Sequence, residues 1–273
     1  MTYEFAKRWM RMVALGVGMI FVVFPLYWMF MTALTPRTEL FKPPYQLLRT
    51  SYSLQNIIDL FSATQFLTFM ANSLIVAFGA VVINVIAATL AGYALSRFQF
   101  RLKGLFVAST LWTYMFPPIL LVIPLYLIFS AIGLRNTYIG LILAHVSISL
   151  PLNIWIMWQY FQIVPVSLEE AAWTSGASRL RALWEVCLPS AVPGIISTAI
   201  FAFALSWNDF SFAFILQTNT SMYTLPVGLA TFVEQSAIHW GLIMASSLLV
   251  SIPTFGLVIF LQRYLMQGFG LGR

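Results

Sequence analysis

The chain of 273 residues is divided into long stretches that contain no charged residue. A helix needs roughly 20 residues to cross about 30 Å of hydrocarbon, and several of these stretches reach that length. They cover residues 12–36, 60–96, 104–134, 136–168, 186–208 and 235–262. The pattern therefore predicts an all-α membrane protein with six transmembrane helices, at about 11–32, 67–96, 104–130, 138–160, 190–210 and 240–262.

Two features modify this picture of uninterrupted spans. Pro117 and Pro118 lie inside the third stretch, and we expect that helix to kink or break because proline removes a helix hydrogen bond. A seventh uncharged stretch, 210–233, carries polar residues from Gln217 to Ser221, and we predict a loop there. Since the chain shows neither a repeat nor a low-complexity tract, we expect a single transmembrane domain over residues 1–273.

Composition and charge agree with a lipid bilayer as the surroundings. Hydrophobic residues make up 60% of the chain and charged residues 8%, against about 25% charged in soluble domains. The net charge of +6 would suggest a nucleic-acid partner for a soluble protein, but the basic residues lie mostly beside span ends, so we expect no nucleic acid. Most Lys and Arg fall on the side that holds both termini. The positive-inside rule therefore predicts a multi-pass protein of the cytoplasmic membrane with both termini cytoplasmic.

The sequence offers little chemistry of its own. A single cysteine, Cys187, excludes an internal disulfide framework and a cysteine metal site. We find no nucleophile–base arrangement and no cluster of metal-ligating residues. The chain also lacks the G-x4-G-K-[ST] loop that binds nucleotide phosphates. We therefore expect that it is not an enzyme, and that it holds neither a cofactor nor a metal.

One polar segment lies between the fourth and fifth spans. Ser167 and Glu170 fit an S-x-x-E capping box at the start of a helix. Gly176 lowers helix propensity and fits a bend between two short helices. An apolar stripe follows at helical spacing, formed by Trp173, Ala177, Leu180 and Trp184. The pattern predicts an amphipathic helical region at about 167–186, which either docks a partner or lies on the membrane surface.

Polar residues near the end of the fifth span are candidates for a solute path. Asp209 is the one acid embedded in a span, near its outer end, and Trp207 and Asn208 precede it. Asn153 lies in the fourth span. Carboxylate and amide groups beside an aromatic face suit a hydroxyl-rich ligand. The alternative for Asp209 is a packing or helix-terminating role, and His145 is expected to be a packed, hydrogen-bonded residue.

The spacing of Glu170-Ala171-Ala172, Gly176 and Leu188-Pro189 resembles the EAA loop of permease subunits of ATP-driven importers. We call residues 167–189 the EAA segment. Nearly the whole chain resembles the permease family of binding-protein-dependent ABC importers, in particular the six-span subunit of its carbohydrate-uptake (maltose-type) branch. Further stretches that carry the resemblance are 25–28, 72–77, 91–98, 117–118, 133–137, 207–210, 225–229 and 262–263.

This resemblance implies a type I ABC importer permease fold, half of a translocation path for a sugar or sugar derivative, and a bacterial or archaeal inner membrane. It also implies partners: a second, different permease, two ATPase subunits that bind ATP and Mg, and an extracytoplasmic substrate-binding protein. Ser175 stands where the family usually has Asp. The contacts with the ATPases are implied at Glu170, Ala171, Ala172, Gly176, Leu188 and Pro189.

Two other classes of protein stay open at this point. A secondary transporter or channel for a small polar solute would typically need ion-coupling charges deep in the spans or internal repeats. A membrane-embedded enzyme should show a polar catalytic cluster near one interface. Co-purification of an ATPase would separate the importer from both.

Overall fold

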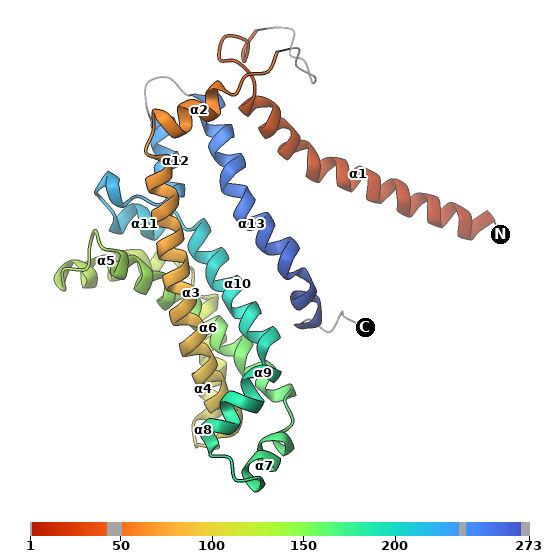
Figure 1. The fold of residues 1–273 in the computed structure, drawn as a ribbon, viewed down its shortest axis with the longest axis vertical. Coiled ribbons are helices and arrows are strands. Elements are labelled where there is room, and N and C mark those ends of the chain that lie inside the picture. Colours follow the sequence, from red (N-terminus) through yellow and green to blue (C-terminus); the bar gives the residue numbers. More distant parts are fainter. Residues whose placement is uncertain (1, 43–50, 235–238, 269–273) are drawn as a thin grey trace. The chain divides into compact units, whose positions relative to one another are not determined.

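The computed structural model describes residues 2–42, 51–234 and 239–268 (Figure 1). Every regular element in these ranges is helical, which confirms the predicted all-α class. The long helices are α1 (Thr2–Ala33), α3 (Phe66–Arg97), α6 (Tyr138–Ile163), α10 (Val192–Asn208) and α13 (Trp240–Gly268). The shorter α-helices are α2 (Gln55–Ser62), α4 (Lys103–Met115), α5 (Ile119–Ala131), α7 (Val166–Thr174), α8 (Arg179–Ala182), α9 (Leu188–Ser190), α11 (Ser211–Leu216) and α12 (Leu225–Glu234).

Four helices in the described ranges are long and apolar enough to cross a membrane unbroken, and they belong to α1, α3, α6 and α13. Two further candidates are bent pairs of helices. One pair joins α4 to α5 at 100°, and the other joins the helical stretch Arg179–Ser190 to α10 at 73°. Counting each bent pair as one crossing gives up to six crossings, the number that the hydrophobic pattern predicts.

Proline explains the break in the third span. Helix α4 ends at Met115, and α5 begins at Ile119 with Pro118 directly before it. Neither Pro117 nor Pro118 has an N–H to donate, so the helical ladder cannot continue through them. The expected interruption is therefore present, and it is a full break. Helix α10 instead tolerates a proline in its first turn, where a missing N–H is not needed.

The stretch 210–233 is not the loop that its polar residues suggested. It contains α11, a short 3₁₀ turn called η2 (Thr220–Met222) and most of α12. Phe212, Ala213 and Leu216 are buried in α11, so these apolar positions decide the local structure. The polar residues form the turn between the helices, where the Asn219 side chain accepts a hydrogen bond from the Ser221 N–H at 3.1 Å.

The chain forms two compact units. The first comprises residues 1–67 and 228–253, and therefore contains α1, α2, most of α12 and the first part of α13. Buried Asn56 of α2 donates from Nδ2 to the carbonyls of Ala33 and Thr35, at 2.9 Å each. These bonds satisfy a buried amide and tie α2 to the end of α1.

The second unit comprises residues 68–227 and 254–273 and contains most of α3 through to α11. Glycines mark the points where its helices approach closely. A Cβ at Gly92 of α3 would lie 2.7 Å from the Cβ of Met157 in α6, and one at Gly194 of α10 would lie 2.5 Å from the Tyr160 ring. Small residues at such contacts let the backbones of membrane helices approach each other.

Candidate functional site

The EAA segment begins just after the end of α6. Val164 and Pro165 separate Ile163, the last residue of α6, from α7. Pro165 directly precedes α7, and no side chain caps the first turn. The predicted capping box is therefore wrong, because Ser167 already lies inside the helix. The first N–H groups of a helix have no acceptor within it, so a proline, which has no N–H, is favoured at a helix start.

A left-handed backbone conformation separates α7 from α8. Gly176 has φ +89°, which residues with a side chain rarely adopt, and the predicted bend is present there. The Ser175 hydroxyl donates to the Ala171 carbonyl at 2.9 Å and so closes the end of α7. Ser178 is the N-cap of α8, because its Oγ accepts a hydrogen bond from the Arg181 N–H at 3.2 Å.

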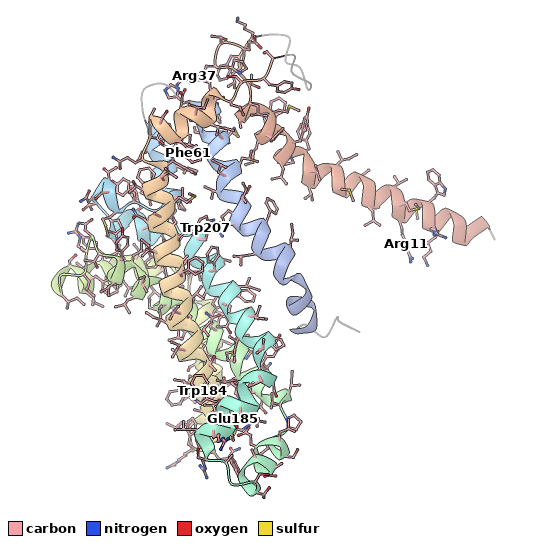
Figure 2. All side chains as sticks on the ribbon, in the orientation of Figure 1. Arg11, Arg37, Phe61, Trp184, Glu185 and Trp207 are labelled. Carbon is pink, nitrogen blue, oxygen red and sulfur yellow. The ribbon has the colours of Figure 1, made fainter. Side chains whose placement is uncertain are left out.

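Apolar side chains of the EAA segment remain exposed. Leu180 and Trp184 are 71% and 68% exposed, and Figure 2 labels Trp184 beside Glu185. Trp173 is 37% exposed, with the Arg179 guanidinium 5.6 Å from its ring centroid. The predicted stripe spans the bend at Gly176, with Trp173 before it and Leu180 and Trp184 after it. Exposed apolar side chains fit both alternatives that the sequence pattern offered, a surface that docks a partner and a helix on the membrane surface.

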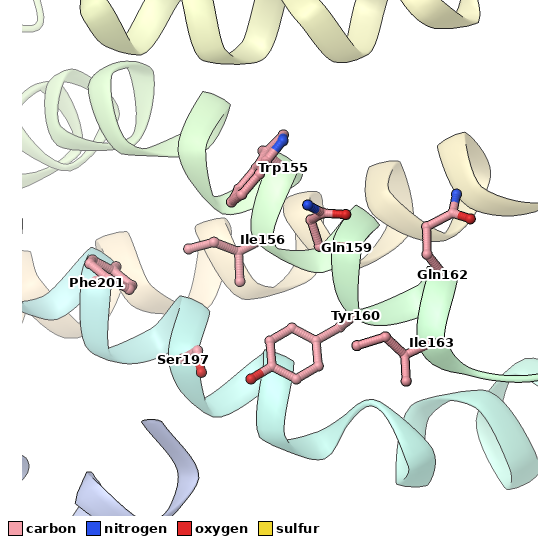
Figure 3. A pocket seen from close by; sticks show the side chains of 8 residues that line it. All are labelled: Trp155, Ile156, Gln159, Tyr160, Gln162, Ile163, Ser197 and Phe201. Carbon is pink, nitrogen blue, oxygen red and sulfur yellow. The ribbon is translucent and has the colours of Figure 1, made fainter. Parts of the chain in front are cut away.

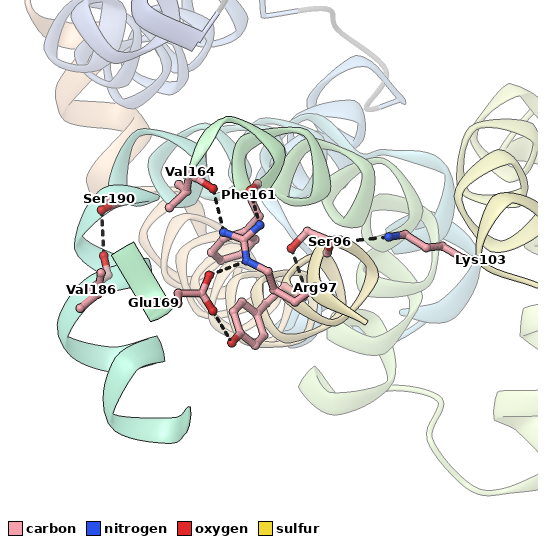
Figure 4. A network of polar contacts seen from close by, with 9 residues as sticks. Ser96, Arg97, Lys103, Phe161, Val164, Glu169, Val186 and Ser190 are labelled. Atoms are coloured by element: carbon pink, nitrogen blue, oxygen red, sulfur yellow. Dashed lines mark hydrogen bonds and ion pairs between the residues drawn. The ribbon is translucent and has the colours of Figure 1, made fainter. Parts of the chain in front are cut away.

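A buried ion pair that the sequence motif does not indicate anchors the start of the segment (Figure 4). Arg97, the last residue of α3, donates from Nε to Glu169 of α7, and the two side chains are 9% and 0% exposed. The other carboxylate oxygen of Glu169 accepts a hydrogen bond from the Tyr93 hydroxyl at 2.9 Å. The buried carboxylate is therefore Glu169, whereas Glu170, the first residue of the motif, is exposed.

Leu188 and Pro189 close the EAA segment. A π-helical turn, η1 (Leu183–Cys187), precedes them, and the Leu188 N–H donates to the Leu183 carbonyl. The wider turn accommodates Pro189, which cannot donate to an ordinary helical ladder. Leu188 packs on a buried cluster formed by Ala88, Met157, Phe161, Leu183, Cys187 and Ala191. The end of the segment is thus joined to residues of α3 and α6.

Asp209 lies where α10 ends and α11 begins. Its carboxylate pairs with His145 Nε2 at 3.1 Å, and His145 Nδ1 lies 2.7 Å from the Ser206 hydroxyl. Asp209 also accepts hydrogen bonds from the N–H groups of Phe212 at 3.4 Å and Ala213 at 3.0 Å. His145 is thus the buried, hydrogen-bonded residue that we expected. The carboxylate of Asp209 thus satisfies N–H groups at the start of α11, and its role in a solute path stays a prediction.

The other candidate path residues have separate environments. Trp207 is 1% exposed and stacks on Phe203 with a centroid distance of 5.3 Å, so its ring offers no open face to a ligand. Asn208 is exposed. Asn153 is fully buried and donates to Asn84 Oδ1 at 3.0 Å, while its own Oδ1 has no hydrogen-bond partner among the described residues. A role of these residues in a solute path stays a prediction.

Two cavities adjoin α6 and α10 in the second unit. One has a volume of about 290 Å³, and its lining includes Tyr114, Ser149, Asn153 and Phe201. The other has a volume of about 360 Å³ (Figure 3). Its lining combines amides and aromatic rings that the sequence pattern did not indicate, among them Trp155, Gln159, Tyr160 and Gln162 of α6 with Ser197 and Phe201 of α10.

Fold and site together define a class of protein. The apolar helices suffice for several membrane crossings, and the EAA segment joined to them leaves Leu180 and Trp184 exposed. The chain belongs to the family described as binding-protein-dependent transport system inner membrane component, whose model matches residues 83–270. This membership places the chain in the inner membrane as a multi-pass ABC permease and decides against a secondary transporter or channel.

Relatives match the chain along almost its whole length. It is 33% identical over 260 residues to the inner membrane ABC transporter permease protein YcjP of Escherichia coli, covering 94% of this chain and 93% of that protein. It is 32% identical over 275 residues to the trehalose/maltose transport system permease protein MalG of Thermococcus litoralis, covering 100% and 98%. The diacetylchitobiose uptake system permease protein DasC of Streptomyces coelicolor is 31% identical over 268 residues, with 98% and 97% covered.

A solved structure shows that the fold is that of a type I ABC importer permease. A chain in the crystal structure of a bacterial ABC transporter involved in the import of the acidic polysaccharide alginate superimposes with a TM-score of 0.84. The two chains are 22% identical, and the match covers 96% of this chain and 97% of the other. At this identity the likeness concerns the fold alone.

Proposed function

We propose that the chain is one permease subunit of an ATP-driven importer of a sugar or sugar derivative, and that it forms half of the translocation path. The names of relatives support the solute class. Permeases 29–32% identical to this chain are named for trehalose and maltose, for diacetylchitobiose and for sulfoquinovosyl glycerol. These solutes share many hydroxyl groups, which amide and hydroxyl side chains along the path would bind.

The exposed surface of the EAA segment is the observation that carries this proposal. If ATP drives transport, a permease that itself lacks a phosphate loop must receive that energy through contact with an ATPase, and Leu180 and Trp184 leave apolar area for such a contact. We assign one of the importer's two ATPase subunits to this surface, with ATP and Mg bound to the ATPase subunits. The assigned contact residues are Glu170, Ala171, Ala172, Gly176, Leu188 and Pro189.

The remaining partners belong to the same assembly. A second, different permease would complete the path, and an extracytoplasmic binding protein would deliver the solute. A solved structure with a similar chain supports the binding protein, since it holds a bacterial alginate ABC transporter in complex with a periplasmic protein bound to an alginate pentasaccharide. Because ten of the 14 Lys and Arg lie on one side, both termini and the EAA segment are assigned to the cytoplasm.

Within the path, Asn208 is the best-placed candidate to contact solute because its side chain is exposed. We assign Asp209 and Asn153 as polar groups behind it, and buried Trp207 as support for the end of α10. The variant Asn208→Ala should raise the KM of uptake about fivefold, the weight of one hydrogen bond, with ATP hydrolysis unchanged. An unaltered KM would remove Asn208 from the path.

The first experiment is purification of the tagged chain in mild detergent after expression with its neighbouring genes. Recovery of a second permease and an ATPase is expected. Phosphate release from Mg-ATP should rise when a binding protein loaded with trehalose, maltose or diacetylchitobiose is added. Recovery of this chain alone, with solute uptake that needs no ATP, would overturn the proposal.

A further inference from the structure

Arg97 reaches both sides of the short connection between α6 and α7. Its Nη1 and Nη2 donate to the carbonyls of Phe161 and Val164, at 2.9 Å each, at the end of α6. Its Nε donates to Glu169, on the first turns of α7. One guanidinium therefore binds the helix before the connection and the helix after it (Figure 4).

The connection between α6 and α7 is short and non-helical. Only Val164 and Pro165 lie between α6 and α7, and both have extended backbone angles, with ψ of 116° and 132°. The helical ladder is interrupted there, because Pro165 has no N–H to continue it. Arg97 therefore supplies, with side-chain hydrogen bonds, a link across the connection that the backbone ladder does not make.

The polar groups of this network are satisfied. The carboxylate of Glu169 accepts hydrogen bonds from Arg97 and Tyr93, and all three donor nitrogens of the guanidinium are engaged. A buried ion pair is a poor way to gain stability, because desolvation of the two charges offsets their attraction. Such a pair does fix geometry, because the planar guanidinium offers donors in set directions.

We propose that Arg97 and Glu169 are positioning residues, which make α7 move as one body with the ends of α3 and α6. A displacement of the exposed part of the EAA segment is then transmitted into the spans. Without the pair, the displacement would be absorbed by rotation at Val164 and Pro165. This inference rests on the proposed importer function, and names the residues through which coupling enters the membrane helices.

The test compares Arg97→Lys with Arg101→Lys in the complete complex, reconstituted in liposomes. Lysine keeps the charge but presents one compact ammonium group, which cannot bind both sides of the connection. Arg101 is exposed and four residues further along the chain, so it controls for the exchange itself. The readout is the uptake of labelled trehalose, maltose or diacetylchitobiose per ATP hydrolysed. This ratio should fall about tenfold for Arg97→Lys, which corresponds to the loss of one charge-assisted hydrogen bond. It should stay unchanged for Arg101→Lys.

The reactivity of the native Cys187 tests the link between α6 and α7 without any solute. Cys187 is buried in the same cluster as Phe161, so N-ethylmaleimide should modify it several-fold faster in Arg97→Lys than in the unmodified complex. Uptake and hydrolysis that fall in parallel, or a cysteine that stays equally protected, would overturn the inference.

If Arg97→Lys fails to assemble, a double variant serves instead. Arg97→Gln with Glu169→Gln leaves no unpaired charge, and it should assemble and show the same loss of coupling. An unmodified complex without ATPase would instead reject the proposed importer function.

Discussion

At the scale of single residues, Gly92 fixes how closely α3 and α6 approach. An added Cβ would lie 2.7 Å from the Met157 Cβ and 2.8 Å from the Trp158 nitrogen. Part of that contact is backbone, which cannot rotate away. The glycine is therefore required by the packing of its neighbour, and its own backbone angles do not demand it.

We expect Gly92→Ala to lower the free energy of unfolding by about 1–3 kcal/mol, because the helices must separate to admit the methyl group. Gly104→Ala is the matched control, since nothing lies within 4 Å of a Cβ there, and a helical alanine should be neutral or stabilising. Thermal unfolding in detergent, followed by circular dichroism, measures both. Equal midpoints for the two variants would contradict the close contact.

Glu169 and Glu170 show what the sequence could reveal about the site and what it could not. The EAA spacing correctly indicates a distinct segment with a bend at Gly176. It draws attention to Glu170, yet the buried carboxylate is Glu169. Adjacent helical residues point about 100° apart, so the choice depends on Arg97, 72 residues earlier in the chain. The sequence feature that could have indicated this pair is Arg97 itself, a basic residue at the end of the second predicted span.

At the scale of elements, the breaks in helices are as informative as the helices. Prolines 117 and 118 predict the interruption between α4 and α5, because the cause is local to the backbone. The helices within 210–233 escaped prediction, since they depend on burial of Phe212 and Leu216 against other elements. The predicted capping box is wrong for a local reason instead: α7 begins directly after Pro165, so Ser167 already lies inside the helix.

Gly176 allows the bend between α7 and α8 to be tested. Gly176→Ala should lower the free energy of unfolding by about 1 kcal/mol, since an L-residue at positive φ is strained. Space is open around Gly176, so no clash contributes. Gly176→Asn should lie closer to the unmodified protein, because Asn tolerates this conformation. The measurements are unfolding and the ATPase recovered on purification; an alanine variant equal to the asparagine variant in both would contradict the argument.

At the scale of the whole molecule, composition and hydrophobic length predict the class, because the requirement to cross a bilayer acts on every span separately. They do not predict that the stretch Arg179–Ser190 and α10 form a bent pair or that the chain divides into two compact units. The division into two units arises from contacts between distant segments, whereas the break between α4 and α5 is local to Pro117 and Pro118.

The assigned orientation predicts which loops a membrane-impermeant maleimide reaches in intact spheroplasts. Thr220→Cys should be labelled, whereas Ser178→Cys should be labelled only after permeabilisation. Both positions are exposed, and the native Cys187 is buried and contributes little background. The reverse pattern would place the EAA segment outside the cell and reject its contact with a cytoplasmic ATPase.

The buried pair between Arg97 and Glu169 also has a consequence for biogenesis. During synthesis α3 reaches the translocon before α7 exists, so Arg97 first faces water, where its charge helps to hold that end of α3 on the cytoplasmic side. Only when α6 has inserted and α7 follows does Glu169 arrive to bury it. The same guanidinium thus serves first as a topology signal and later as a structural contact.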